Sequence, residues 1–182
     1  MRSSAARDTI GPISALRSRP SVMRSNLARS VKAAITLSVD VPEGLMIDGY
    51  PGSYGQILTN LFLNAANHAF ADGRSGAIAI SARGRGSDDV EIIFADNGAG
   101  MTPDVQRQAF DPFFTTRRNE GGTGLGLHIV YNLVTQQLGG RMMLDSRLGQ
   151  GTTFRIIMPR AAKGGAATAE ADDLSGERDA AE

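Results

Sequence analysis

The chain has 182 residues, of which 41% are hydrophobic, and its formal net charge at pH 7 is zero. This composition is typical of a single globular domain, and the neutral balance gives no reason to expect a nucleic acid or a membrane surface as a partner. Cysteine is absent, which excludes disulfides, thiolate metal ligands and cysteine nucleophiles. No apolar run reaches about 18 residues, so we expect no transmembrane helix and a cytoplasmic location, possible also within a membrane-associated parent protein.

The two ends of the chain differ from its middle. Residues 1–32 contain six arginines and Lys32 against a single acid, Asp8, and we interpret residues 1–34 as a linker or the remnant of an upstream helical region. Residues 161–182 are rich in alanine, glycine and acids. Such a segment cannot bury enough apolar area to offset its chain entropy, so we expect a disordered tail. The folded domain is therefore expected over residues 35–160.

Strand and helix patterns alternate through this domain. In chain order the sequence predicts a strand at 35–39, a helix near 53–70, strands at 77–83 and 90–95 joined by a hairpin loop over 84–89, a short helix starting at 102–104, a long helix over 124–138, and a hairpin of strands at 141–146 and 152–158. Thr102 suits a helix cap, and Pro103 suits the first helical position. The pattern favours an α+β two-layer sandwich, in which helices cover one face of a mixed, mostly antiparallel sheet.

Four polar side chains share one stripe of the first predicted helix. They are Asn60, Asn64, Asn67 and His68, at positions i, i+4, i+7 and i+8. Asparagine is a poor helix former, so three within eight residues require a reason. An amide oxygen is a hard, neutral ligand suited to Mg²⁺, which usually bridges phosphates. Taken alone, the stripe is equally compatible with a solvated polar face.

A second motif follows the strand at 90–95 and reads Asp96-Asn97-Gly98-Ala99-Gly100. An aspartate at a strand end can accept a hydrogen bond from an exocyclic amine such as that of adenine. The glycines would let the backbone approach a flat base closely. By itself, the motif is also simply a good turn.

A third motif is the glycine-rich loop Gly122-Thr123-Gly124-Leu125-Gly126-Leu127, which runs into an apolar helix. Successive backbone N–H groups and a helix N-terminus attract phosphate. The loop is not a Walker motif, because no lysine follows the glycines in the required spacing. It does not match the dinucleotide fingerprint either, since Leu127 and His128 stand where a glycine is needed.

Residues 110–122, which we call the lid, connect the last two motifs. Phe113-Phe114 is expected to be an apolar anchor, and the polar stretch that follows ends in two glycines. This composition is typical of a mobile loop that closes over a ligand. Arg117 and Arg118 could reach a γ-phosphate with charge-assisted hydrogen bonds. The alternative is a solvated basic loop.

In this order, between residues 60 and 127, the motifs resemble the ATP-binding catalytic domain of the sensor histidine kinases. That family belongs to a wider superfamily with gyrase, Hsp90 and the mismatch-repair ATPases. The resemblance covers roughly residues 35–160 and implies a Bergerat-type fold with ATP and Mg²⁺ as cofactors.

Individual roles follow from the resemblance. It implies that Asn64 coordinates Mg²⁺ and that Asp96 binds the adenine amino group, and it gives catalytic roles to Asn60, Asn64 and Arg117. Phe110, Phe113 and Phe114 match the motif that anchors the lid, and Arg117 stands where many members carry lysine. The implied nucleotide-binding residues are Asn64, Asn67, His68, Asp96, Gly98, Gly100, Phe113, Thr115, Thr116, Gly122, Thr123, Gly124, Leu125, Gly126, Leu127 and Thr152.

The resemblance also bears on the reaction. Members that hydrolyse ATP place a glutamate four residues before the Mg²⁺ asparagine, where this chain has Asn60. We therefore expect a protein-histidine kinase that transfers the γ-phosphoryl group. Neither His68 nor His128 lies in the context of an acceptor histidine, so the expected partners are a separate histidine-containing dimerisation domain and a response regulator receiver domain.

The isolated chain is expected to be a monomer, with no nucleic acid or membrane contact. Two alternatives remain open. One is an anti-sigma-type serine kinase or an ATPase of the same superfamily. The other is a non-catalytic, ATP-binding regulatory module.

Overall fold

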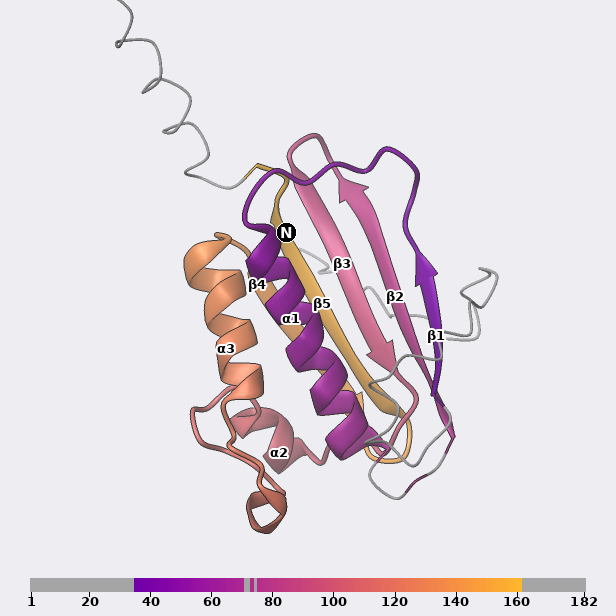
Figure 1. The fold of residues 1–182 in the computed structure, drawn as a ribbon, viewed down its shortest axis with the longest axis vertical. Helices are drawn as coiled ribbons and strands as arrows, with labels where there is room; N and C mark the ends of the chain where they lie inside the picture. The colour runs from indigo at the N-terminus through magenta and orange to yellow at the C-terminus, as the bar shows by residue number, and fades with distance from the viewer. Residues whose placement is uncertain (1–34, 71–72, 74, 162–182) are drawn as a thin grey trace, which may run out of the picture.

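The computed structural model describes residues 35–70, 73 and 75–161 (Figure 1). Five strands form one sheet in the order β1-β2-β3-β5-β4. β1 runs parallel to β2, and every other neighbouring pair is antiparallel. The elements are β1 (Ile35–Asp40), α1 (Pro51–Asn64), β2 (Gly76–Arg85), β3 (Asp89–Asp96), α2 (Pro103–Gln108), α3 (Gly126–Asn132), β4 (Arg141–Arg147) and β5 (Gly151–Pro159).

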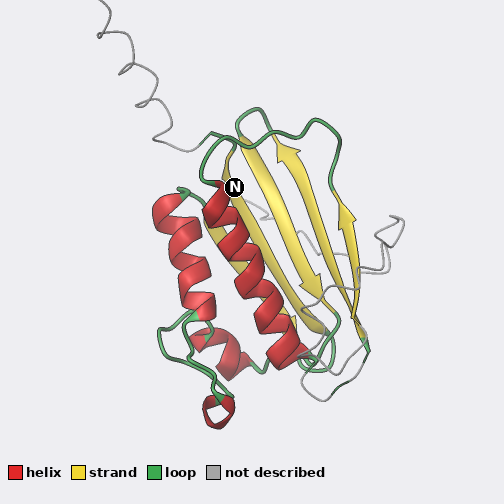
Figure 2. Ribbon diagram, viewed as in Figure 1, coloured by secondary structure: helices red, strands yellow, loops and turns green. Residues whose placement is uncertain are grey.

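The helices all lie on one face of this sheet, as Figure 2 shows. The expected α+β two-layer sandwich with a mixed, mostly antiparallel sheet is therefore confirmed. Alternation along the strands explains the arrangement, because every second residue of a strand points to the same face. Val90 and Phe94 of β3 and Phe154 of β5 share the face toward the helices, and each side chain is fully buried.

The apolar stripe of α1 fixes how that helix lies on the sheet. Ile57, Leu61 and Ala65 recur at helical spacing and are buried in the core. Phe62 adds an edge-to-face contact with Phe94, with ring centroids 5.2 Å apart. Because this stripe faces the sheet, the asparagine stripe beside it is turned toward the side where α3 begins.

Both long helices end in a π-helical turn. α1 continues into such a turn over Ala65–Ala69, and α3 does the same over Leu133–Gln137. The second helix then stops at Gly139, whose φ of +64° is in the left-handed region that favours glycine at a helix end. π-helical turns frequently occur at functional sites, and the one after α1 contains two residues of the predicted stripe.

Local signals placed α2 correctly. The Thr102 hydroxyl accepts a hydrogen bond from the Val105 N–H at 3.4 Å, and Pro103 occupies the first helical position. The hairpin loop predicted over 84–89 was wrong in extent. β2 continues to Arg85, which pairs with Asp89, and only residues 86–88 turn the chain. The polar composition of the exposed strand tips had suggested a loop where the ladder in fact continues.

The expectations for residues 1–34 and for most of 161–182 lie outside the described residues. Ala161 itself is described and forms a single parallel bridge with Asp48. The boundaries of the domain stay a prediction. Within the described ranges, no helix combines the length and apolar character needed to cross a lipid bilayer.

Candidate functional site

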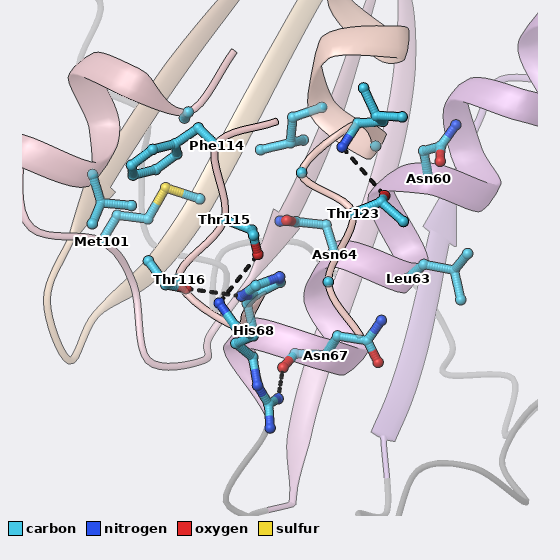
Figure 3. Close-up of a pocket in the computed structure, with 18 of the residues that line it drawn as sticks. Asn60, Leu63, Asn64, Asn67, His68, Met101, Phe114, Thr115, Thr116 and Thr123 are labelled. Carbon is cyan, nitrogen blue, oxygen red and sulfur yellow. Dashed lines mark hydrogen bonds between the residues drawn. The ribbon is translucent and has the colours of Figure 1, made fainter. Parts of the chain in front are cut away.

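A cavity of about 570 Å³ opens beside the C-terminal half of α1 (Figure 3). Its walls come from α1 and the π-helical turn that follows, from α2 with the segments on either side of it, from the lid, and from the glycine-rich loop with the start of α3. Leu148, in the turn between β4 and β5, adds one more wall residue. Segments far apart in the sequence therefore meet around one space.

Most of the residues implied by the family resemblance line this cavity. They are Asn60, Asn64, Asn67, His68, Gly100, Thr115, Thr116, Arg117, Gly122, Thr123, Gly124, Leu125, Gly126 and Leu127. Four others do not line it, namely Asp96, Gly98, Phe113 and Thr152. The fold thus brings together the asparagine stripe, the lid and the glycine-rich loop. The four exceptions are described below.

The asparagine stripe supplies the amides of the site. Asn60 donates a hydrogen bond from Nδ2 to the Gln56 carbonyl at 3.0 Å, so its amide group is tied to its own helix. The half-buried Asn64 side chain makes no hydrogen bond within the described part of the chain. Figure 3 places it between the lid and the glycine-rich loop. A half-buried amide without a protein partner is available to a ligand.

The described lining of the cavity carries basic side chains and no acidic ones. Among its described lining residues, only His68 and Arg117 carry ionisable side chains, and none carries a carboxylate. Burial, and to a smaller extent the nearby Arg117 guanidinium, lower the pKa of His68 below its ordinary value. The site therefore offers a positive charge and a neutral imidazole, and the described part of its lining contains no carboxylate that could serve as a general base.

Two contacts join the lid to the end of α1. The Thr116 hydroxyl lies 3.2 Å from His68 Nδ1, and Arg117 Nη1 donates to the carbonyl of Asn67. Figure 3 shows Thr116 beside His68, with Asn67 close by. The lid is thus held across the helix terminus by side chains that the sequence had assigned to nucleotide binding.

The lid also closes on itself. The Thr115 hydroxyl accepts from the Arg117 N–H at 3.1 Å, and the Gly122 N–H donates to the Arg117 carbonyl at 3.1 Å. Arg118 Nη2 donates to the carbonyl of Phe113 at 3.0 Å. These bonds give the lid a defined shape although it contains no long helix.

Phe113 differs from the expectation. Its side chain is 63% exposed and outside the cavity lining, so the expected apolar anchor is wrong for this residue. Its φ of +65° is the one positive φ found at a non-glycine residue in the described ranges. The backbone turns sharply here, which points the ring outward. Phe114 lines the cavity instead.

Asp96 lies behind the cavity wall, with only 2% of its surface exposed. Burial raises the pKa of its carboxyl to about 6, although hydrogen bonds from the backbone of Gly98 and Thr152 act in the opposite direction. The Gly98 N–H donates to Asp96 Oδ1 at 2.9 Å. Thr152 is the partner of Asp96 in the β3–β5 ladder, so these two predicted residues do lie together.

Ser146 links this pair to the cavity. Its hydroxyl lies 3.0 Å from Thr152 Oγ1 and accepts from the N–H of Met101 at 2.9 Å. Met101 lines the cavity. Two hydrogen bonds through Ser146 therefore connect Thr152 with the cavity lining, and Asp96 lies beside Thr152 in the sheet.

The glycines of the Asp96 motif have a packing role. A Cβ added at Gly98 would stand 2.3 Å from the Cβ of Ala69, at the end of the π-helical turn. One added at Gly100, whose φ is +66°, would stand 2.0 Å from the carbonyl oxygen of Arg147. The expectation was close approach to a ligand, whereas these contacts are with the protein itself. Only Gly100 also lines the cavity.

Sequence reasoning missed six apolar residues of the lining. They are Leu63, Met101, Val105, Ala109, Ile129 and Leu148. Val105 and Ala109 are four residues apart after a recognisable cap, which could have revealed a shared face. Leu148 is 68% exposed in a turn and gave no signal.

Known proteins share this sequence over most of the described domain. The family described as histidine kinase-, DNA gyrase B-, and HSP90-like ATPase matches residues 49–162. Sensor histidine kinase ZraS of Salmonella typhimurium is 41% identical over 113 residues, which are 62% of this chain and 23% of that protein. Sensor kinase CckA of Brucella abortus is 35% identical over 153 residues, covering 76% of this chain and 16% of that protein.

Solved structures give the same answer. The catalytic domain of histidine kinase ThkA has a TM-score of 0.61 and 26% identity, covering 74% of this chain and 85% of that one. Full-length ShkA in complex with AMPPNP has a TM-score of 0.59 and 32% identity, covering 70% of this chain and 26% of that one. The chain spans about a quarter or less of the curated relatives named above. It belongs to the family of histidine kinase-, DNA gyrase B- and HSP90-like ATPases, and the relatives that it resembles are sensor histidine kinases.

Proposed function

We propose that this domain binds Mg²⁺·ATP and transfers the γ-phosphoryl group to a histidine on a separate dimerisation domain, from which a receiver domain would take it. The observation that carries the proposal is the cavity itself. An asparagine stripe, a glycine-rich loop and a lid with Arg117 converge on it, and its described lining contains no carboxylate. ShkA, a structural relative, was solved with the ATP analogue AMPPNP.

The polyphosphate chain would lie against the lid and the glycine-rich loop. Backbone N–H groups of such loops attract phosphate oxygens, and threonine hydroxyls can donate to them. Arg117 would supply the charge-assisted hydrogen bonds. The adenine ring would pack against apolar residues of the lining near Met101, and Asp96 would accept a hydrogen bond from its amino group. Because Asp96 is buried, that bond requires the base to enter beyond Met101 or reach the carboxylate through water.

Asn64 would hold the metal. Its half-buried amide has no hydrogen-bond partner among the described residues, and an amide oxygen is a ligand that Mg²⁺ accepts. When bound, Mg²⁺ neutralises charge that develops on the phosphates. Asn60 and Asn67 would then border the same phosphates as uncharged neighbours.

The absence of an acid in the described lining favours transfer over hydrolysis. Water needs a base to remove its proton; Asn60 cannot act as one, and the described lining offers only His68 in its place. A neutral histidine attacks with a lone pair and needs no such base, so positioning and charge stabilisation would be sufficient. A serine hydroxyl must lose a proton, for which the described lining offers only His68. The serine-kinase alternative is therefore less well supported.

Asn64→Ala tests the proposal. Calorimetric titration of the full chain with ATP should show binding that Mg²⁺ strengthens in the wild type, and the variant should lose that strengthening. Transfer of labelled phosphate to a separately supplied dimerisation domain should fall at least about a hundredfold. The matched control is Thr59→Ala, an exposed position of α1 outside the cavity, which should behave like the wild type.

The results separate the alternatives. Wild-type transfer by the Asn64 variant would refute the metal role. An acid-stable phosphate on the acceptor would indicate a serine kinase, whereas phosphohistidine is acid-labile. Tight ATP binding without transfer to any histidine domain would support a regulatory module. A wild-type protein without saturable affinity for adenine nucleotides at millimolar concentration would remove the proposal altogether.

A further inference from the structure

His128 lies in α3 and is not among the residues that line the cavity. Its ring nonetheless contacts the lid. Nδ1 lies 3.0 Å from the carbonyl oxygen of Phe110, the first residue of the lid. A carbonyl oxygen only accepts hydrogen bonds, so Nδ1 carries the proton and donates. The contact joins two residues that are 18 positions apart in the sequence.

The other ring nitrogen is also occupied. Nε2 of His128 lies 3.0 Å from Nδ2 of Asn132, one helical turn further along α3. With the amide nitrogen on that side, Asn132 donates and Nε2 accepts, which keeps the proton on Nδ1. The tautomer that can hold Phe110 is thus the one that the helix itself selects.

A second contact holds the same residue of the lid. The ring of Tyr131 packs on the ring of Phe110 with centroids 5.2 Å apart. Residues of α3 therefore contact both the carbonyl group and the side chain of Phe110. Such paired contacts fix the direction in which the chain leaves Phe110 more firmly than either contact alone.

The other end of the lid is fixed to the same helix. After Gly122 the chain passes through Gly124 and enters α3 at Gly126. Gly124 packs so tightly on the lid backbone that an added Cβ would stand 2.4 Å from the carbonyl carbon of Phe113. The C-terminal end of the lid thus leads directly into the start of α3, and its first residue is bonded to His128 of α3, so both ends are anchored to one helix.

We propose that His128 is a positioning residue for nucleotide binding, because its hydrogen bond to Phe110 closes the base of the lid and so places Thr115, Thr116 and Arg117 over the cavity. The inference rests on the proposed function for its effect on nucleotide affinity. The hydrogen bond between His128 and the lid does not depend on that function, and a proteolysis experiment without nucleotide tests it separately.

The first measurement is affinity in the full chain with Mg²⁺. His128→Ala should weaken ATP binding about tenfold, as expected for one lost hydrogen bond that orders the phosphate contacts. ADP, which lacks the γ-phosphate, should lose no more than about twofold. His128→Asn keeps a donor near the position of Nδ1 and should recover most of the ATP affinity. Gln136→Ala, an exposed change in the same helical segment, is the control and should match the wild type.

The second measurement needs no nucleotide. Trypsin cleaves after arginine, and the lid offers Arg117 and Arg118. Cleavage there should be several-fold faster in His128→Ala than in the wild type, and His128→Asn should restore the slower rate. Thermal unfolding shows whether the whole domain has changed, and the midpoint of His128→Ala should fall by no more than about 4 °C.

Two results would overturn the inference. One is His128→Ala with wild-type cleavage and wild-type ATP affinity. The other is equal weakening of ATP and ADP together with a large fall in the unfolding midpoint, which is what a merely structural residue would give. If the wild type binds no nucleotide, the proposed function fails, and the cleavage experiment still decides whether His128 holds the lid.

Discussion

The two sides of the cavity are built in different ways. The Asp96 side is buried, with exposed fractions of 2% for Asp96, 6% for Ser146 and 4% for Thr152, and glycines let its backbone segments touch. The lid side is open. Phe113 is 63% exposed, and the Thr116 and Arg117 contacts to the end of α1 are hydrogen bonds at the surface.

This difference separates stability from ligand contact. A buried group whose contacts are backbone and close-packed cannot change without disturbing the fold. A surface loop held by a few hydrogen bonds can change shape at little cost to the unfolding free energy. Substitutions on the Asp96 side should therefore act mainly on stability, and substitutions in the lid should act mainly on nucleotide binding.

The largest effect is expected for Gly100→Ala. The new Cβ would meet the Arg147 carbonyl oxygen at 2.0 Å, and φ of +66° disfavours any side chain. We expect a loss of about 3 kcal/mol or more in unfolding free energy, measured by chemical denaturation. Gly121→Ala is the matched control, since its φ is +84° but no atom lies within 4 Å of the added Cβ. It should cost only about 1 kcal/mol. Equal losses for the two variants would contradict the packing argument.

An intermediate effect is expected from the Asp96 carboxyl. Its pKa is raised to about 6 in the folded protein, against about 4 when unfolded, so between these values the folded state keeps a proton that the unfolded state releases. This contribution to stability is present below about pH 4 and is lost as the pH rises to about 6, by about 1–3 kcal/mol.

The measurement is the unfolding free energy of wild type and Asp96→Asn from pH 4 to pH 8. Because asparagine does not titrate, the difference between the two proteins isolates Asp96 from the other carboxylates. The wild type should lose stability relative to the variant as the pH rises to about 6 and then run parallel to it. A constant difference over the whole range would show that Asp96 titrates alike in both states.

The smallest effect on the fold is expected in the lid. Arg117→Ala should weaken ATP binding about tenfold through the lost phosphate contact, with a smaller loss for ADP. Its unfolding free energy should change by less than about 0.5 kcal/mol, because the hydrogen bond from Arg117 to the Asn67 carbonyl is exposed to solvent. Arg107→Ala removes an exposed arginine outside the cavity and should leave ATP affinity unchanged. A destabilised Arg117 variant with normal ATP affinity would reverse the contrast between the two sides.

Periodicity and caps predicted the framework well, because they are local. The apolar face of α1 followed from Ile57, Leu61 and Ala65, and its orientation carried the asparagine stripe to the cavity. Thr102 and Pro103 placed α2 for the same reason. The fold class then followed from the order of the elements.

The burial of individual side chains and the contacts between residues far apart in the sequence could not be predicted in this way. The Asp96 motif looks like a ligand-facing turn, and only the tertiary structure places Asp96 behind Met101. The outward ring of Phe113 depends on a single backbone angle. No sequence spacing links His128 to the Phe110 carbonyl, because that contact depends on how the lid lies against α3 in the folded structure.

The parallel pairing of β1 has a practical consequence. The family match begins at residue 49, after β1. All six residues of β1 nevertheless pair with residues 76–81 of β2 and so cover that edge of the sheet. A protein trimmed to the family boundaries would leave that edge as a row of unpaired amides beside Ile78 and Ile80. Uncovered edges of this kind recruit strands from other molecules, so the trimmed protein would be prone to aggregate although its cavity is intact.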